Sequence, residues 1–356
     1  MSRKKWSFVL SGIMSVSLLL AACGGGGGQQ AAQPSGQGGG QPAAQTGAPS
    51  SDGQSYVFKA GHSLTEDHPY HLALKKMAED VDKRSNGKVK IEVYPLSQLG
   101  AERELTEALT FGTADMSITS TAPVTNFYAK LGVLDLPFLF ESREQAYKVL
   151  DGKVGEEMLK NLESANLVGL AWAENGFRHI TNGTKDIKKP EDVSGMKIRT
   201  QENPIHLAAF ETLGAKPTPM AWTEALTALQ QGVVDAQENP AIVAQTYKLY
   251  DSKQTHMSLT GHVYSAAMIL FSKPVWDKLP ADVQQLIAEE AKKAGQYERE
   301  LMIKMEEEAI ANLKAKGVVV TEDVDKQAFR EAMKPVYDKF SDQFGKELVD
   351  EIVNTK

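Results

Sequence analysis

Residues 197–240 decide the fold class, and they read KIRTQENPIHLAAFETLGAKPTPMAWTEALTALQQGVVDAQENP. A short apolar run is followed by two segments with helical spacing, which end at Gly214 and Gly232. The tetrapeptide Gln-Glu-Asn-Pro occurs twice, at 201–204 and 237–240, each time between a short apolar run and an apolar segment with helical spacing. Asn as N-cap and Pro at the first helical position begin a helix cleanly. We therefore interpret both copies as strand-to-helix junctions.

The region before this stretch shows the same alternation of patterns. It predicts strands at 56–61, 89–95, 114–120, 177–182 and 196–200, and helices at 69–87 and 102–112. A second series of elements begins near Gly176, and the turn pair Asn182-Gly183 closes its first strand. Strands that alternate with helices form βαβ units, so we expect an α/β protein with a largely parallel sheet.

The two series resemble each other at one point. Residues 108–115 and 228–235 share the pattern Ala-Leu-x-x-Gly-x-x-Asp. In each, the glycine is predicted to close a helix, and the next residues start a strand. An internal duplication would explain the match, and so would the frequency of helix-Gly-strand junctions in α/β proteins. The sequence leaves both explanations open.

Residues 1–22 have the layout of a secretory signal, with basic residues before an apolar stretch that is too short to span a bilayer. Small residues then precede Cys23, the only cysteine of the chain, as in the lipobox of a bacterial lipoprotein. We predict that Cys23 is the lipidated first residue of the mature protein. Residues 23–55 are predicted to be a lipidated Cys and a flexible tether, because the segment consists mainly of Gly, Gln, Ala, Pro and Ser. The body would then lie outside the cytoplasm, anchored to a membrane by lipid.

Charge and length narrow the possible functions further. The formal net charge is −7, and no basic stripe is present that could neutralise phosphates, so nucleic acid is not an expected partner. Residues 56–356 are too many for one small core and indicate two lobes.

Two arginines suggest an anion-binding cleft. Arg199 lies on the expected strand directly before the first tetrapeptide, and Arg178 lies near the start of the second series. In open α/β sheets, ligands bind at the carboxyl ends of strands, where helix N-termini present free N–H groups to anions. A planar guanidinium suits bidentate recognition of a carboxylate. The alternative is that both arginines are solvated residues at the edge of the sheet.

The segments GMKIRT and LGAKPTPMAWTEALTALQQGVVDAQENP resemble the signature of solute-binding proteins of TRAP transporters, in the dicarboxylate-binding family. The resemblance continues from YVFKAGHS through YPLSQLG and LPFLF to LFSKPVWDKLP. It implies two α/β lobes of the periplasmic-binding-protein type that close on an organic acid, with a sodium-coupled membrane permease as the partner. No cofactor and no metal are expected. The implied lobes are 56–176 plus about 266–303, and 177–265 plus about 304–356.

The same resemblance assigns site residues one by one. Arg199 would form the bidentate salt bridge to the ligand carboxylate, and Arg178 would assist it. Asn239 would donate a hydrogen bond to the same carboxylate, whereas Asn203 would serve only as a cap. Trp222 falls where many relatives carry a pocket-lining Phe, although a core aromatic between helices is an equal alternative.

The distal end of the ligand is less defined. Ser120 occupies a position where some sialic-acid-binding relatives carry Glu. Glu102 is expected to face the cleft from the first lobe. The expected site is completed by His62. These residues leave open whether the ligand is a monocarboxylate, a C4-dicarboxylate or a sugar acid.

Two further patterns have competing interpretations. His68 and His71 could mimic a metal-binding pair, but surface or capping histidines fit better because the sequence offers no third ligand. Residues 282–316 have helical spacing over a length of about 50 Å. A coiled-coil arm would fit this pattern, but we favour a helix that bridges both lobes.

The rival functions are a tethered extracytoplasmic hydrolase and the receptor of an ATP-driven importer. The sequence contains no G-x-S-x-G, H-E-x-x-H or Walker A motif, and no cysteine after Cys23 that could serve as a nucleophile. We therefore expect a receptor and not an enzyme. Only the resemblance separates the TRAP receptor from the receptor of an ATP-driven importer.

Overall fold

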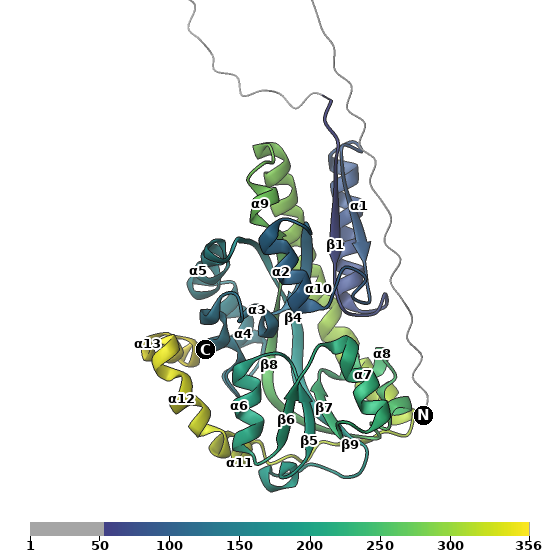
Figure 1. Ribbon diagram of the computed structural model, residues 1–356, viewed down its shortest axis with the longest axis vertical. Coiled ribbons are helices and arrows are strands. Elements are labelled where there is room, and N and C mark those ends of the chain that lie inside the picture. Colours follow the sequence, from purple (N-terminus) through teal and green to yellow (C-terminus); the bar gives the residue numbers. More distant parts are fainter. Residues whose placement is uncertain (1–52, 356) are drawn as a thin grey trace, which may run out of the picture. The chain divides into compact units, whose positions relative to one another are not determined.

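The computed structural model describes residues 53–355, and the strands of this region form a single nine-stranded sheet (Figure 1). The order across the sheet is β2-β1-β3-β8-β4-β7-β5-β6, with β9 paired to β8. The strands are β1 (Tyr56–Gly61), β2 (Val89–Tyr94), β3 (Met116–Ser120), β4 (Leu167–Asn182), β5 (Lys197–Thr200), β6 (Lys216–Pro219), β7 (Ala236–Asn239), β8 (His256–Ser272) and β9 (Val319–Thr321). The predicted signal peptide, Cys23 and nearly all of the predicted tether lie outside the described residues.

Helices connect the strands and pack on both faces of the sheet. They are α1 (Pro69–Arg84), α2 (Glu102–Phe111), α3 (Thr121–Val124), α4 (Arg143–Leu150), α5 (Lys153–Asn161), α6 (Pro204–Thr212), α7 (Trp222–Gln231), α8 (Ala241–Thr246), α9 (Lys273–Trp276), α10 (Ala281–Ala315), α11 (Lys326–Ala332), α12 (Lys334–Phe344) and α13 (Lys346–Asn354). The described part of the chain contains no helix that is both long and apolar enough to cross a membrane.

The sheet is mixed, which corrects the prediction of a largely parallel sheet. The outer strands are parallel: β1 pairs with β2 and β3, and β5 pairs with β6 and β7. The two long central strands, β4 and β8, are antiparallel to each other, and each is antiparallel to its outer neighbour, β7 and β3 respectively. The difference arises because the chain passes from one half of the sheet to the other along β4 and returns along β8.

The long strand β4 was only partly predicted. The expected strand began at 177, but β4 starts at Leu167 and pairs with β8 along its length. Gly176 lies inside the strand with a φ of 113°, at a shift of register between Glu174 and Gly176. Glycine tolerates this left-handed backbone at little cost, so it produces a bulge and not a strand boundary.

Burial on both faces explains why β8 is apolar without a break. Alternate residues Tyr264, Ala266, Met268 and Leu270 belong to one hydrophobic cluster. The residues between them, such as Ala267, Ile269 and Phe271, belong to the other. A strand covered on both sides has no polar face, so its sequence does not alternate.

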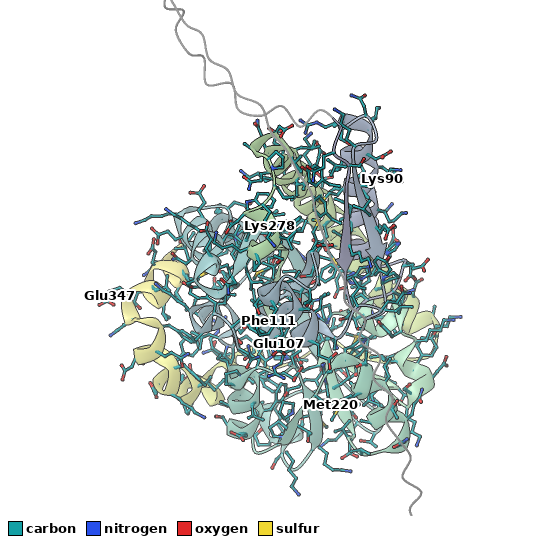
Figure 2. All side chains as sticks on the ribbon, turned by 45° about the horizontal axis from the view of Figure 1, so that its top comes forward. Lys90, Glu107, Phe111, Met220, Lys278 and Glu347 are labelled. Atoms are coloured by element: carbon teal, nitrogen blue, oxygen red, sulfur yellow. The ribbon has the colours of Figure 1, made fainter. Side chains whose placement is uncertain are left out.

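The predicted helices of the two series are confirmed, as is their closure by glycine. Gly112 ends α2 with a φ of 73°, and Gly232 ends α7 with a φ of 72°, both in the left-handed region. The matching patterns at 108–115 and 228–235 thus adopt the same local geometry. Figure 2 shows Glu107 and Phe111 on the outward side of α2, and Phe111 is 72% exposed.

Helix α10 spans 35 residues and bridges the halves of the sheet, as expected. It contacts α1, β4 and α8, so it is not a projecting arm. It approaches β4 most closely at Gly295, where a Cβ atom would lie 2.3 Å from the carbonyl oxygen of Trp172. The close packing of helix on strand therefore requires glycine at this position.

The two Gln-Glu-Asn-Pro copies begin their helices differently. In the first, Asn203 is the N-cap of α6, and its Oδ1 accepts from the N–H groups of Ile205 and His206. In the second, the same expectation is wrong, because Asn239 is the last residue of β7. The N–H groups of Ala241 and Ile242, at the start of α8, instead donate to Glu306 of α10 at 2.8 and 3.0 Å.

Candidate functional site

Arg199 is the buried cation of the site. It lies on β5 next to the first tetrapeptide, and only 3% of its surface is exposed. Its Nε and Nη2 donate to the carbonyl oxygen of Met220 at 3.0 and 2.7 Å. Because Arg199 is buried, the interpretation of it as a solvated residue at the edge of the sheet is wrong. No acidic side chain of the described region forms a salt bridge with it. Burial lowers the pKa of Arg199 to about 10, with Glu238 raising it and Arg178 lowering it further.

Trp222 packs against this guanidinium. The Cζ atom of Arg199 lies 5.3 Å from the centre of the Trp222 ring, in the geometry of a cation–π contact. The Trp222 ring also meets Tyr247 edge-on at 5.2 Å. The Tyr247 hydroxyl donates to the carbonyl oxygen of Ser63, which follows β1, at 2.5 Å. A single chain of contacts thus connects Arg199 to the other half of the sheet.

Arg178 lies on β4 and is fully buried beside Glu238 of β7. Its Nε and Nη2 donate to the Glu238 carboxylate at 2.5 and 2.8 Å, and its Nη1 donates to Oδ1 of Asn175 at 2.9 Å. The Nε2 of His262 lies 3.3 Å from the same carboxylate. Burial raises the pKa of Glu238, but the charge and hydrogen bonds of Arg178 outweigh it, so the pKa is well below its usual range. Glu238 is therefore an ionised partner for Arg178.

Asn239 follows Glu238 and pairs with His179 across β7 and β4. Its Nδ2 donates to Oε1 of Gln237 at 2.6 Å. Because β7 lies between β4 and β5, the strands that carry Arg178, Asn239 and Arg199 are consecutive in the sheet.

Glu102 and Ser120 are in direct contact in the half of the sheet that contains β1. The Glu102 Oε1 accepts from the Ser120 hydroxyl at 3.2 Å and from its backbone N–H at 3.1 Å. Gln201, in the first tetrapeptide, donates from Nε2 to the Ser120 hydroxyl at 2.9 Å. Residues on opposite halves of the sheet thus meet at Ser120.

His62 forms a pair with His71, at 3.1 Å between Nε2 and Nδ1. Burial, and then the neighbouring His71, lower the pKa of His62 to about 3, so its ring is neutral at pH 7. His68 caps α1 by accepting from the N–H of Tyr70 at 3.2 Å. The capping role is confirmed, but His68 is fully buried and not at the surface. The described residues contain no group of three or more potential metal ligands.

The structure therefore connects the predicted residues in four groups. Arg199 lies with Trp222, Glu102 with Ser120, Arg178 with Glu238, and His62 with His71. Sequence reasoning missed Glu238, Gln201 and Tyr247. The repeated tetrapeptide was the available signal for two of them, since Gln201 and Glu238 are members of its first and second copies.

Comparison with known families gives one match that covers most of the chain. The model described as bacterial extracellular solute-binding protein, family 7, matches residues 60–343. A solute-binding protein of Verminephrobacter eiseniae is 42% identical over 281 residues, which is 79% of this chain and 84% of that protein.

Solved structures give the same result. A TRAP periplasmic solute-binding protein from Polaromonas sp. JS666, bound to D-erythronate, is 41% identical with a TM-score of 0.83, covering 85% of this chain and 99% of that one. One from Sulfurospirillum deleyianum, with bound succinate, is 31% identical with a TM-score of 0.81, covering 85% of this chain and 100% of that one.

Proposed function

Because this chain belongs to family 7 of the bacterial extracellular solute-binding proteins, the receptors of TRAP transporters, we propose that it captures an organic acid by pairing the acid's carboxylate with Arg199. The observation that carries this proposal is a buried guanidinium without an acidic partner among the described residues. An unpaired charge inside a protein costs several kcal/mol, and a carboxylate ligand would offset that cost. Three N–H groups remain for the ligand, two on Nη1 and one on Nη2, since only Nε and one N–H of Nη2 donate to Met220.

The other site residues take roles that follow from their contacts. Trp222 would fix the position of the Arg199 guanidinium through the cation–π contact, and Asn239 would donate to the carboxylate from the neighbouring strand. Arg178 would assist the binding of the carboxylate indirectly, because Glu238 balances its charge and Glu238 and Asn175 accept from four of its five N–H groups. Glu102, Ser120 and His62 would contact the distal part of the acid.

Ligands of relatives support the class of compound. The Polaromonas protein holds D-erythronate and the Sulfurospirillum protein holds succinate, both small carboxylates. We extend this class to the present chain. The acid would pass unchanged to a TRAP-type permease in the membrane, and the chain would have no catalytic role of its own.

Closure of two lobes would complete the site. The fold of this family is two-lobed. We assign residues 56–176 plus about 266–303 to one lobe and 177–265 plus about 304–356 to the other. The contacts of Tyr247 with Ser63 and of Gln201 with Ser120 join these segments, as expected of a closed form.

Calorimetry of wild type and variants tests the function. Arg199→Ala should weaken binding of the cognate acid by at least about thirtyfold, since loss of one partner of a buried charge pair costs on the order of 2–5 kcal/mol. Arg199→Lys should recover part of the loss, because lysine keeps the charge without the planar fork. Arg330→Ala, which removes an arginine 43% exposed, is the matched control and should bind normally.

Near-normal affinity in a folded Arg199→Ala protein would refute the assignment. The acid should also be recovered chemically unchanged after incubation. Small-angle scattering of the same samples should show compaction at saturating acid, and its absence would contradict lobe closure.

A further inference from the structure

A second cavity lies apart from the Arg199 site, where β4 and β8 pass between the halves of the sheet. Its volume is about 370 Å³, and its walls come from residues 138–143, the middle of β4, the bend of β8 at Gly261, residues 306–310 of α10, and α11. None of the residues assigned to the acid at Arg199 lines it. The volume is within the range of small-molecule sites in proteins, about 300–1,000 Å³. We call this space the β4–β8 cavity.

An interruption of the β4–β8 ladder forms the floor of this cavity. The register shifts between Arg178 and Ile180, so residues 259–262 of β8 lie opposite His179 alone. Gly261 turns the strand there with a φ of 55°, and its N–H donates to Nδ1 of His179 at 3.0 Å. Glycine adopts this left-handed backbone at little cost, and irregular strands of this kind often lie beside functional sites.

Three side chains present N–H groups to the cavity that have no partner within residues 53–355. Only Nε of Arg143 donates, to Glu174 at 2.6 Å, which leaves its Nη1 and Nη2. Burial lowers the pKa of His179 to about 3, and because its Nδ1 accepts, the neutral ring carries its proton on Nε2. Nζ of Lys326 lies 3.6 Å from the position of a Cβ atom at Gly261. The cavity therefore has an excess of hydrogen-bond donors.

The acidic side chains of the wall do not use these donors. Glu306 is buried, and its two oxygens accept from the N–H groups of Ala241 and Ile242. Burial raises the pKa of Glu306 to about 7, so it carries only part of a charge near neutral pH. Glu141 and Glu307 are exposed, where solvent screens their charge. A ligand with its own anionic acceptor, such as a carboxylate, therefore fits the donors of the cavity.

The rest of the wall is apolar. Phe138, Phe140 and Phe177 line the cavity together with Ile310 of α10. The rings of Phe140 and Phe177 each meet Tyr264 edge-on, at 5.4 and 5.2 Å, which fixes their positions. Apolar surface of a ligand that packs against these rings leaves water, which is favourable in proportion to its area. The wall thus favours a hydrocarbon body beside the carboxylate.

We propose that the β4–β8 cavity is a second binding site, which takes a small monocarboxylate with an aromatic or branched apolar body. The carboxylate would accept from Arg143, His179 and Lys326, and the body would lie against the phenylalanines. Arg143 and Phe140 belong to the first assigned lobe, and His179 and Lys326 belong to the second. A ligand that contacts both would favour the closed form. This coupling rests on the proposed function, whereas binding in the cavity does not.

Calorimetry with phenylacetate tests the site. The Arg199→Ala chain lacks the anion-binding group of the first site, and it should still bind one phenylacetate. Phenylacetamide lacks the charge and acetate lacks the ring, so each should bind at least ten times more weakly, the equivalent of about 1.4 kcal/mol. Equal affinity for either compound would overturn the proposed chemistry. Binding to wild type alone would place phenylacetate at Arg199 and overturn the second site, as would the absence of binding to both chains.

Substitutions in the cavity locate the bound phenylacetate, in wild type and in Arg199→Ala. Ile310→Trp fills the cavity and should abolish binding there. Lys326→Ala removes one donor and should weaken binding about tenfold. Ile303→Trp and Lys304→Ala change exposed residues of α10 that do not line the cavity, so these matched controls should bind normally. Unchanged affinity in both cavity variants would show that phenylacetate binds elsewhere.

Small-angle scattering tests the coupling to lobe closure. Saturating phenylacetate should compact the Arg199→Ala chain, and the same chain with Ile310→Trp should not respond. An unchanged radius of gyration on binding would overturn the coupling, whereas loss of calorimetric binding would overturn the site itself. The receptor function is tested separately, by the loss of acid binding when Arg199 is replaced in wild type.

Discussion

The second copy of Gln-Glu-Asn-Pro predicts a large loss of stability from a single atom exchange. Glu238→Gln keeps the shape of the side chain but removes its charge and replaces one oxygen with an NH₂ group. Arg178 would then remain fully buried with a donor facing its own N–H groups, at positions where the carboxylate now accepts at 2.5 and 2.8 Å.

The magnitude follows from the isolation of Arg178. Removing one partner of a buried ion pair costs about 3–5 kcal/mol, because the other charge is left uncompensated. At roughly 2 °C per kcal/mol for a chain of this size, Tm should fall by about 6–10 °C. The lowered pKa of Glu238 agrees with a stabilising ion pair. Its contribution to the free energy of unfolding is present above the pKa of an unfolded Glu, and it is lost only as the pH falls through the lower pKa of the folded protein.

The chain contains its own control for this experiment. Glu202, the equivalent residue of the first copy, is 30% exposed and lies 3.8 Å from Arg103. An exposed pair of this kind contributes about 0–1 kcal/mol, so Glu202→Gln should melt within about 2 °C of wild type. Thermal unfolding followed by circular dichroism measures both variants. Equal Tm values for Glu238→Gln and Glu202→Gln would refute the reasoning. The double variant Arg178→Met, Glu238→Leu leaves no unpaired buried charge, so it should be more stable than Glu238→Gln, and the opposite order would also refute the reasoning.

Three other predictions concern the bridging helix α10, the pH dependence of stability, and the location of the protein. Gly295→Ala should cost about 1–3 kcal/mol in chemical denaturation, since its Cβ would lie 2.3 Å from the carbonyl oxygen of Trp172; an unchanged midpoint would show that α10 shifts freely. Burial lowers the pKa of His179 to about 3, so the stability from its neutral ring is present above pH 6.5 and lost as pH falls toward 3. His179→Asn keeps an acceptor for Gly261, and its stability should fall less steeply below pH 6.5, by up to about 1.4 kcal/mol per pH unit, in melts from pH 7 to 4.5. Cys23→Ala should release the mature protein from membranes on fractionation, and retention at the wild-type level would contradict a lipid anchor.

Local pattern was sufficient for most elements of this fold. The helices α1, α2 and α7 follow from apolar spacing, and α2 and α7 also from the glycines at their ends. The long strand β4 was cut at Gly176 because a bulge glycine and a strand boundary look alike in sequence. The pairing of Gly176 with Ser265 shows which of the two is present, and that pairing depends on chain segments far apart.

The site was harder to predict for the same reason. Asn239 was expected to cap α8, but the acceptor for the N–H of Ala241 is Glu306, which lies 65 residues further along the chain. Arg199 and Trp222 were both proposed from the sequence and lie in contact, whereas the ion pair of Arg178 with Glu238 depends on the pairing of β4 with β7. Residue types at the site can be inferred from one sequence, but which charges neutralise one another is decided by tertiary packing.

The passage of β4 and β8 through the whole sheet limits how this molecule can be divided or engineered. β3 pairs with residues 267–271 of β8, and β7 pairs with residues 179–182 of β4, so each half of the sheet depends on a strand that also belongs to the other. No contiguous fragment contains a complete half, and expression of either half by itself would leave a long apolar edge without a neighbour. A reporter domain for a biosensor should therefore be inserted at an exposed helix end, such as that at Phe111, because an insertion there leaves the shared strands β4 and β8 intact.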